Sequence, residues 1–166
     1  MRTVVKASAV ELLRKVAQQA YLHNPGNCSG AVHDVIRKLV NPAAPYRLAN
    51  ALMGYLANPA NGWSKVRDYA EASALADRGV VVVGGLAEPG GHGHVIVVLP
   101  GRWRPSGGYK VDGRMMPSHG MFPPAMSTSL GPWPGAVSDG DKTVFDPWDN
   151  VQVFKHVTFW AWQKKS

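Results

Sequence analysis

Apolar residues recur every three or four positions through the first half of the chain, which is the spacing of a helix with one buried face. The spacing is interrupted at Asn24-Pro25-Gly26, at Asn41-Pro42 and at Gly79, and these residue types commonly end helices. The first half is therefore predicted to be helical. We expect helices over about 8–23, 28–40, 46–57 and 64–78.

The pattern changes to that of strands after Gly79. Val80–Gly84 is a β-branched run too short for a helix, and residues 94–99 form a second such run after a glycine-rich loop. Glycine and proline are frequent over 101–140, which leaves room for short strands near 109–111 and 126–129. Residues 152–162 alternate in polarity and predict a last strand.

This order of elements predicts an α+β fold, with N-terminal helices packed on an antiparallel β-sheet. Neither an internal repeat nor a linker divides the sequence, so we expect a single domain over 1–166.

The chain carries 18 basic and 11 acidic residues, a net charge of +7, which favours anionic partners such as nucleic acid, a membrane surface or a bacterial cell wall. No apolar run is long enough for a signal peptide or a membrane span, so synthesis in the cytoplasm without a signal peptide is expected.

The single cysteine, Cys28, stands in Asn27-Cys28-Ser29-Gly30 at the predicted start of the second helix. One cysteine excludes an internal disulfide and any zinc site built from several thiolates. At a helix N-terminus, backbone N–H groups and the helix dipole stabilise a thiolate, so we expect the pKa of this thiol to lie below its ordinary value. The alternative is a buried structural cysteine without a chemical role.

A partner base for the thiol is available at the start of the second strand. His94 follows Gly90-Gly91-His92-Gly93 and directly precedes the apolar run, so the strand would hold it more rigidly than the loop holds His92, its competitor for this role. The remaining histidines, expected at the surface, are His23, His33, His119 and His156. A metal site from His92, His94 and His119 lacks any recognised ligand spacing, and no nucleotide-binding motif occurs, so neither metal nor cofactor is expected.

Aromatic residues among basic ones support a different function. Arg102 and Arg104 flank Trp103, which is either part of a solvated loop or a stacking platform for a sugar or a base. The rival hypothesis is therefore a non-catalytic basic module that binds glycan or nucleic acid through Trp103 and Trp133. A thiol acyltransferase would use the same cysteine and histidine as a hydrolase.

Two motifs give the chain a resemblance to a known family. Asn27-Cys28-Ser29-Gly30-Ala31-Val32 opens a helix and Gly93-His94-Val95-Ile96-Val97-Val98 opens a strand. Both motifs resemble those of bacterial type VI secretion amidase effectors, relatives of the papain-like NlpC/P60 cysteine peptidases. Further similarity lies in Trp63-Ser64-Lys65-Val66, in Ala70-Glu71-Ala72 and in Val81–Leu86, so the resemblance covers about residues 20–100.

The resemblance implies a papain-like fold and hydrolysis of an amide in peptidoglycan stem peptides, commonly the D-glutamyl to diaminopimelate bond. It further implies delivery by a secretion apparatus into the periplasm of a target bacterium, and a cognate immunity protein; nucleic acid is not expected as a partner. Cys28 would be the nucleophile and its backbone N–H an oxyanion donor, His94 the base, and Ser127 the residue that orients the imidazole. Asp112 and His119 remain alternatives to Ser127. As substrate-binding residues we expect Asn27, Ser29 and Trp103.

Overall fold

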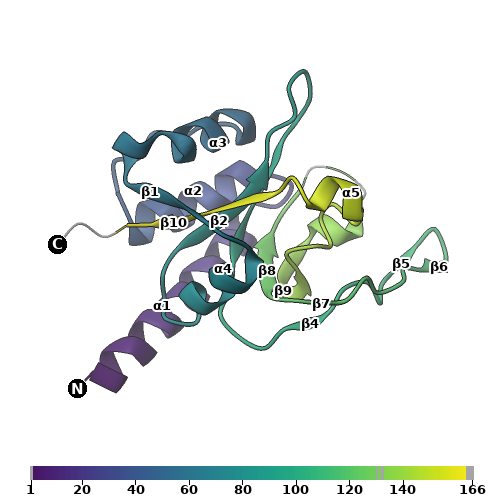
Figure 1. Cartoon of the computed structure of the whole chain (residues 1–166), viewed down its shortest axis with the longest axis horizontal. Coiled ribbons are helices and arrows are strands. Elements are labelled where there is room, and N and C mark those ends of the chain that lie inside the picture. The colour runs from purple at the N-terminus through teal and green to yellow at the C-terminus, as the bar shows by residue number, and fades with distance from the viewer. Residues whose placement is uncertain (1, 130, 132, 164–166) are drawn as a thin grey trace.

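A computed structural model describes the backbone of residues 2–129, 131 and 133–163, and the side chains from residue 9 onward. Its main feature is a six-stranded antiparallel sheet in the order β1-β10-β2-β3-β8-β9 (Figure 1). In this spatial order the strands are Trp63–Val66, Thr158–Trp162, Val82–Leu86, His94–Val98, Pro124–Ser127 and Ser138–Thr143. Mixed helices and an antiparallel sheet confirm the α+β prediction.

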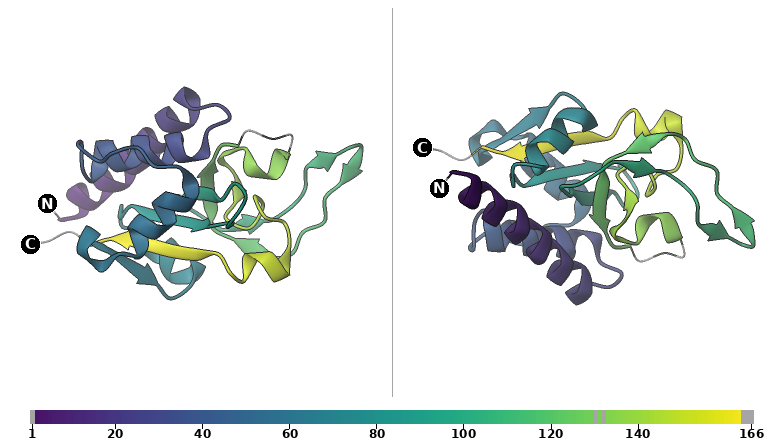
Figure 2. Two further views of the ribbon diagram at one scale, coloured as in Figure 1. Left: turned by 90° about the horizontal axis from the view of Figure 1, so that it is seen from above. Right: turned by 90° about the horizontal axis from the view of Figure 1, so that it is seen from below.

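The helices α1 and α2 lie together on one side of this sheet, as Figure 2 shows. Within the described residues the α-helices are α1 (Arg2–His23), α2 (Cys28–Leu39), α3 (Ala49–Ala57), α4 (Tyr69–Ala76) and α5 (Val151–Phe154), and the short 3₁₀ helices are η1 (Pro59–Asn61) and η2 (Pro134–Ala136). Over the residues that the structure describes, no helix combines the length and the apolar content needed to cross a bilayer.

Both faces of the central strands are buried, because a different set of elements covers each face. Val83, Val95 and Val97 belong to a core shared with α1, α2 and α3. Val82 and Ile96 point the other way, into a core with α4 and a cluster of phenylalanines. This two-sided burial explains why β2 and β3 are continuous apolar runs without alternation. Their predicted antiparallel pairing is confirmed, with Leu86 opposite His94.

The predicted helix over 64–78 is wrong in its first part. Residues Trp63–Val66 form β1, which pairs with β10 and buries Trp63 and Val66 at its two ends. Helix α4 begins only at Tyr69, where Asp68 Oδ1 accepts a hydrogen bond from Glu71 N at 3.0 Å. Strand pairing with the far end of the chain overrides the local helical spacing, and sequence spacing alone does not contain that contact.

The predicted strand over 152–162 is half right. Its first residues form α5, because Asn150 Oδ1 accepts hydrogen bonds from the backbone N–H groups of Gln152 and Val153 and caps a helical turn. Strand β10 starts at Thr158 and buries Phe159 and Ala161 on one face, as the alternation predicts.

Helix boundaries differ in two further places. Helix α1 begins at Arg2, six residues before the predicted start at residue 8, and α3 begins at Ala49, three residues later than expected.

Residues 104–122 form an extended arm that leaves the sheet (Figures 1 and 2). Two small ladders build it: β4 (Arg104–Pro105) pairs with β7 (Met121–Phe122), and β5 (Lys110–Val111) pairs with β6 (Arg114–Met115). Asp112 and Gly113 turn the β5–β6 hairpin in the left-handed backbone region. Strand β9, which the sequence pattern did not predict, completes the main sheet beside β8.

Candidate active site

The thiol of Cys28 lies at the N-terminal end of α2, as predicted. Asn27 precedes the helix in a non-helical conformation, and its Oδ1 accepts a hydrogen bond from Gly30 N at 2.9 Å. This side-chain cap satisfies one of the free N–H groups of the first turn. Cys28 is therefore the first helical residue, and its side chain is partly exposed.

A small polar network fixes the start of this helix. Ser29 Oγ lies 2.8 Å from Tyr46 Oη and donates to Asn27 Oδ1 at 3.2 Å. Gly30 has no room for a side chain, because a Cβ atom there would lie 2.6 Å from Asn24 Oδ1 and 2.5 Å from Asn27 Nδ2. Asn27 and Ser29, expected to bind substrate, thus use their side chains to hold the helix start; their substrate-binding role stays a prediction.

His94 begins β3, and an asparagine on α3 anchors the loop before it. Asn50 Nδ2 donates to the carbonyls of Glu88 and Gly91, at 2.9 and 3.2 Å, and Asn50 Oδ1 accepts from Glu88 N at 2.9 Å. A Cβ atom on Gly93 would collide with Asn50 Oδ1, so this close approach requires glycine. The loop that carries His92 and leads to His94 is thereby tied to a helix.

The imidazole of His94 is held by Ser127, which lies on the neighbouring strand β8. His94 Nε2 lies 2.8 Å from Ser127 Oγ, and Ser127 Oγ donates to the carbonyl of Ala136 at 2.7 Å. A serine hydroxyl has a single proton, so Ser127 must accept from His94. The neutral imidazole therefore carries its proton on Nε2, which leaves Nδ1 free to act as a base. Trp148 packs edge-on against the ring, with centroids 5.5 Å apart.

Cys28 and His94 line one pocket of about 500 Å³. Its wall comes from the start of α2, the start of α3 and the loop before β3; Leu48 and Ala49 are apolar contributors, and His92 also lines it. Among the described residues, no hydrogen bond joins the Cys28 thiol directly to the His94 ring.

Burial sets the protonation of this pair. It raises the pKa of the Cys28 thiol, and hydrogen bonds from the backbone N–H groups of Val95, Ser29 and Cys28 offset only part of that effect. Burial lowers the pKa of His94 to about 4. The expectation that the helix N-terminus would lower the thiol pKa is therefore wrong in sign, because loss of solvent outweighs the backbone donors. At neutral pH the resting pair is a thiol and a neutral imidazole.

Two alternatives to Ser127 lie elsewhere. Asp112 is exposed at the turn of the β5–β6 hairpin. His119 is exposed, with Nε2 3.8 Å from Asp149 Oδ1 and its ring 5.2 Å from that of Phe145. Ser127 is thus the one of the three predicted residues that contacts His94.

Trp103 does not line the pocket of Cys28. Its Nε1 donates to Ser73 Oγ at 2.9 Å, and its ring packs 5.5 Å from Tyr69, beyond the opposite face of the sheet. A role in binding substrate at Cys28 is therefore not supported for this residue.

Exposed positions are confirmed for His23, His119 and His156, whereas His33 is buried and its Nε2 accepts a hydrogen bond from Arg47 N. His33 is buried because the face of α2 that carries it packs against the segment before α3.

Sequence reasoning missed Asn50 and Trp148. Neither carries a recognisable motif, and each reaches the site through contacts with residues more than 35 positions away in the chain. A scan against models of protein families and a search of curated proteins both found no match to this chain.

Proposed function

We propose that this protein is a cysteine hydrolase that cleaves an amide bond in peptidoglycan stem peptides. The observation that supports the chemistry is the shared pocket, which presents a helix-start thiol and a strand-start imidazole held in one tautomer by Ser127. The substrate class rests on the motifs around Cys28 and His94, which resemble those of type VI secretion amidase effectors. A papain-like NlpC/P60 architecture is part of the same proposal.

Catalysis begins from the neutral pair. His94 Nδ1 removes the thiol proton as the sulfur attacks the carbonyl carbon of the scissile amide, so that the thiolate forms only when substrate is present. The imidazolium that results keeps its Nε2–H on Ser127. This assignment fits a thiol of raised pKa better than a permanent thiolate–imidazolium pair does.

The negative charge that develops on the carbonyl oxygen needs donors close to the sulfur. The backbone N–H of Cys28 at the start of α2 meets this need, because the Asn27 side chain caps the N–H of Gly30 and not that of Cys28. His94 then returns its proton to the leaving amine, and the C–N bond breaks to give a thioester on Cys28. Water activated by the same imidazole hydrolyses the thioester and regenerates the thiol.

The net charge of +7 suits an enzyme that has to find an anionic cell wall. By the same resemblance, the protein would be delivered through a secretion apparatus into the periplasm of a neighbouring cell, and the producing cell would be protected by an immunity protein. The rival basic module is less well supported. Trp103 Nε1 and Trp133 Nε1 are used in internal hydrogen bonds, to Ser73 Oγ and to the carbonyl of Asp146.

Digestion of defined muropeptides, read by mass spectrometry, tests this proposal. The panel contains stem peptides of different length and cross-linked dimers, with glycan strands that lack stems as the control substrate. The expected result is addition of one water across a stem-peptide amide, with the D-glutamyl to diaminopimelate bond as the first candidate. Cleavage of glycan alone, product joined to an added amine instead of water, or no cleavage by folded protein would each overturn the proposal.

A further inference from the structure

A hollow of about 440 Å³ lies where the loop between β3 and β4 meets α1 and the strands β8 and β9. Arg14 of α1, Arg102 of the loop and Arg104 of β4 line it together. Asp139 of β9 is the acidic residue among those that line it. The described residues around this hollow and those around the pocket of Cys28 have no member in common, so the two sites are separate.

Distances place two of these guanidinium groups at the hollow. Arg104 Nη1 donates a hydrogen bond of 2.7 Å to the carbonyl of Gly140. Arg14 Nη2 lies 3.9 Å from the point that a Cβ atom on Gly101 would occupy. Since Gly101 and Gly140 both line the hollow, side chains of two different elements, α1 and β4, reach the same space.

The loop that forms one side of the hollow is fixed at two points. Leu99 N donates to the carbonyl of Pro124 at 2.9 Å, which ties the start of the loop to β8. Gly101 N donates to Asp77 Oδ1 at 2.9 Å, which ties the middle of the loop to the end of α4. The shape of the hollow is therefore set by the fold before any ligand arrives.

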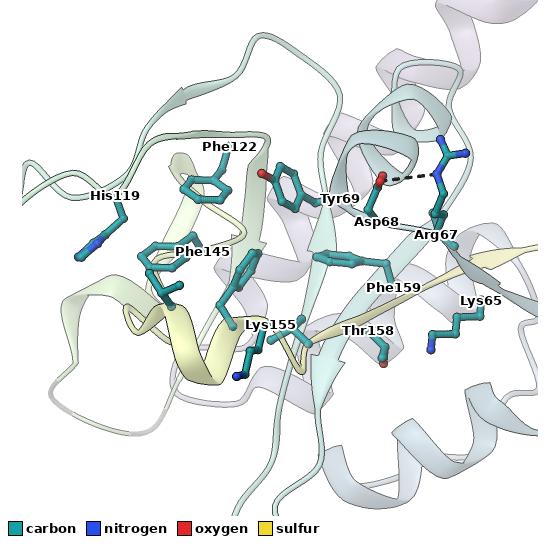
Figure 3. Close-up of a pocket in the computed structure, with 14 residues that line it drawn as sticks. Lys65, Arg67, Asp68, Tyr69, His119, Phe122, Phe145, Lys155, Thr158 and Phe159 are labelled. Atoms are coloured by element: carbon teal, nitrogen blue, oxygen red, sulfur yellow. Dashed lines mark ion pairs between the residues drawn. The ribbon is translucent and has the colours of Figure 1, made fainter.

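Trp103, the residue between the two loop arginines, is held inside the fold. Its ring packs 5.5 Å from that of Tyr69, a member of the aromatic cluster that Figure 3 shows, and its Nε1 donates to Ser73 Oγ. The ring is thus not available as the stacking platform that the sequence suggested. Arg102 and Arg104, on either side of it, are exposed and remain available to a ligand.

The positive charge of this hollow is not compensated by ion pairs. Within the part of the chain that the structure describes, no ion pair joins Arg14, Arg102 or Arg104 to a carboxylate. The partner of Arg104 is a neutral carbonyl, and the carboxylate of Asp77 accepts from a backbone N–H. Three guanidinium groups and the one carboxylate of Asp139 leave a net charge of +2 in the lining.

Guanidinium groups present paired N–H donors that match the oxygens of an anion. A carboxylate has two oxygens and one charge, which a single arginine can satisfy. A phosphate monoester has three terminal oxygens and a charge of about −1.5 to −2 at pH 7, so it can accept from several arginines at once. We propose that this hollow binds the terminal phosphate of a small phosphorylated molecule, held by Arg14 and Arg104 with Arg102 as a third donor. The site does not depend on the thiol chemistry at Cys28.

A matched pair of probes tests this assignment. Phenyl phosphate carries a terminal phosphate, and methyl phenyl phosphate is the same molecule with one more oxygen esterified. The diester has a single negative charge, as each phosphate of a nucleic acid backbone has. In titrations of the full chain at about pH 7.5 and constant ionic strength, followed by amide chemical shifts, we expect phenyl phosphate to bind at least about tenfold more tightly than the diester. The largest shifts should fall on the amides of Gly101 and Gly140.

Variants locate the site. Arg14→Gln with Arg104→Gln should weaken the binding of phenyl phosphate at least about tenfold, and the fold should persist because both side chains are exposed. Arg114→Gln, which changes an exposed arginine of β6 outside the hollow, is the charge-matched control and should leave both affinities unchanged. No binding, equal affinity for the two probes, or phenyl phosphate binding that survives the double substitution in folded protein would overturn the proposal.

Discussion

His94 Nε2 lies 2.8 Å from Ser127 Oγ, and the single hydroxyl proton of Ser127 is committed to the carbonyl of Ala136. This relay fixes which imidazole nitrogen can accept the thiol proton. The position of a β8 serine therefore sets the chemistry of a β3 histidine. The contribution of Ser127 to catalysis can therefore be measured separately from its contribution to folding.

Ser127→Ala should lower kcat/KM for muropeptide hydrolysis by at least about tenfold, a transition-state effect of about 1.4 kcal/mol, because the imidazole loses the hydrogen bond that fixes both its orientation and its tautomer. Ser138→Ala is the matched control. Ser138 is also a buried serine, and its Oγ donates to the carbonyl of Ala125 at 2.7 Å without touching a histidine. Each substitution should cost about 1–3 kcal/mol of stability by orphaning a buried carbonyl.

Imidazole nitrogen chemical shifts provide a second readout for the same pair of variants. The wild type and Ser138→Ala should show His94 with its proton on Nε2, and Ser127→Ala should show a mixture. Equal losses of activity in the two serine variants would mean that Ser127 is structural only.

Protein stability should fall as the pH drops from about 6.5 towards 4. His94 has its pKa lowered to about 4 in the folded state, so the unfolded chain binds its proton first and the folded state is favoured most above pH 6.5. Burial lowers the pKa of His33 as well, which acts in the same direction.

Urea denaturation between pH 4 and 7 measures this dependence. His94→Gln should flatten the slope of the unfolding free energy against pH, whereas His156→Gln, at an exposed position, should leave it as in the wild type. A wild-type slope in His94→Gln would contradict the buried, neutral imidazole.

Asn50→Ala removes the three hydrogen bonds that tie α3 to the loop before His94. The loop should open more often, so we expect faster amide hydrogen exchange over 88–93 together with lower kcat/KM. Asn58→Ala is the control, because Asn58 Oδ1 caps η1 through Ala60 N and lies outside the site. If exchange over 88–93 and activity are unchanged in Asn50→Ala, the loop does not depend on this anchor.

Two glycines in helices should respond to alanine with opposite signs. A Cβ atom on Gly30 in α2 would fall within 2.8 Å of three side-chain atoms of Asn24 and Asn27, so Gly30→Ala should cost at least about 1 kcal/mol and loosen the cap beneath Cys28. Gly54 in α3 meets nothing within 4 Å, so Gly54→Ala should stabilise by about 0.4–1 kcal/mol. Denaturant midpoints of both variants decide, and destabilisation by Gly54→Ala would contradict the description of α3.

Local patterns in the sequence predicted the elements that carry the thiol and the imidazole. Helix α2 follows from the helical spacing of its apolar residues, and strands β2 and β3 follow from their short β-branched runs. The helix predicted over 64–78 failed at β1, whose pairing with β10 joins segments almost a hundred residues apart. Contacts of that range have no local signature.

The same limit applies to the candidate site. Cys28 and His94 stand out by residue type and by their place at the start of an element, whereas Asn50 and Trp148 act only through tertiary contacts. The sign of the thiol pKa shift was wrong because the number of backbone donors near a helix start can be anticipated from sequence, but the extent of burial cannot. His33 shows the same limit, since its neighbour across the fold determines that it is buried.

The most direct test of Cys28 as nucleophile compares muropeptide hydrolysis by the wild type and by Cys28→Ala and Cys28→Ser, at equal concentration and with matching thermal melts. Both substitutions change only the sulfur atom of a partly exposed side chain, so the fold should persist. We predict that hydrolysis falls by at least about a thousandfold in each variant. Wild-type rates of stem-peptide cleavage in folded Cys28→Ala would contradict the assignment.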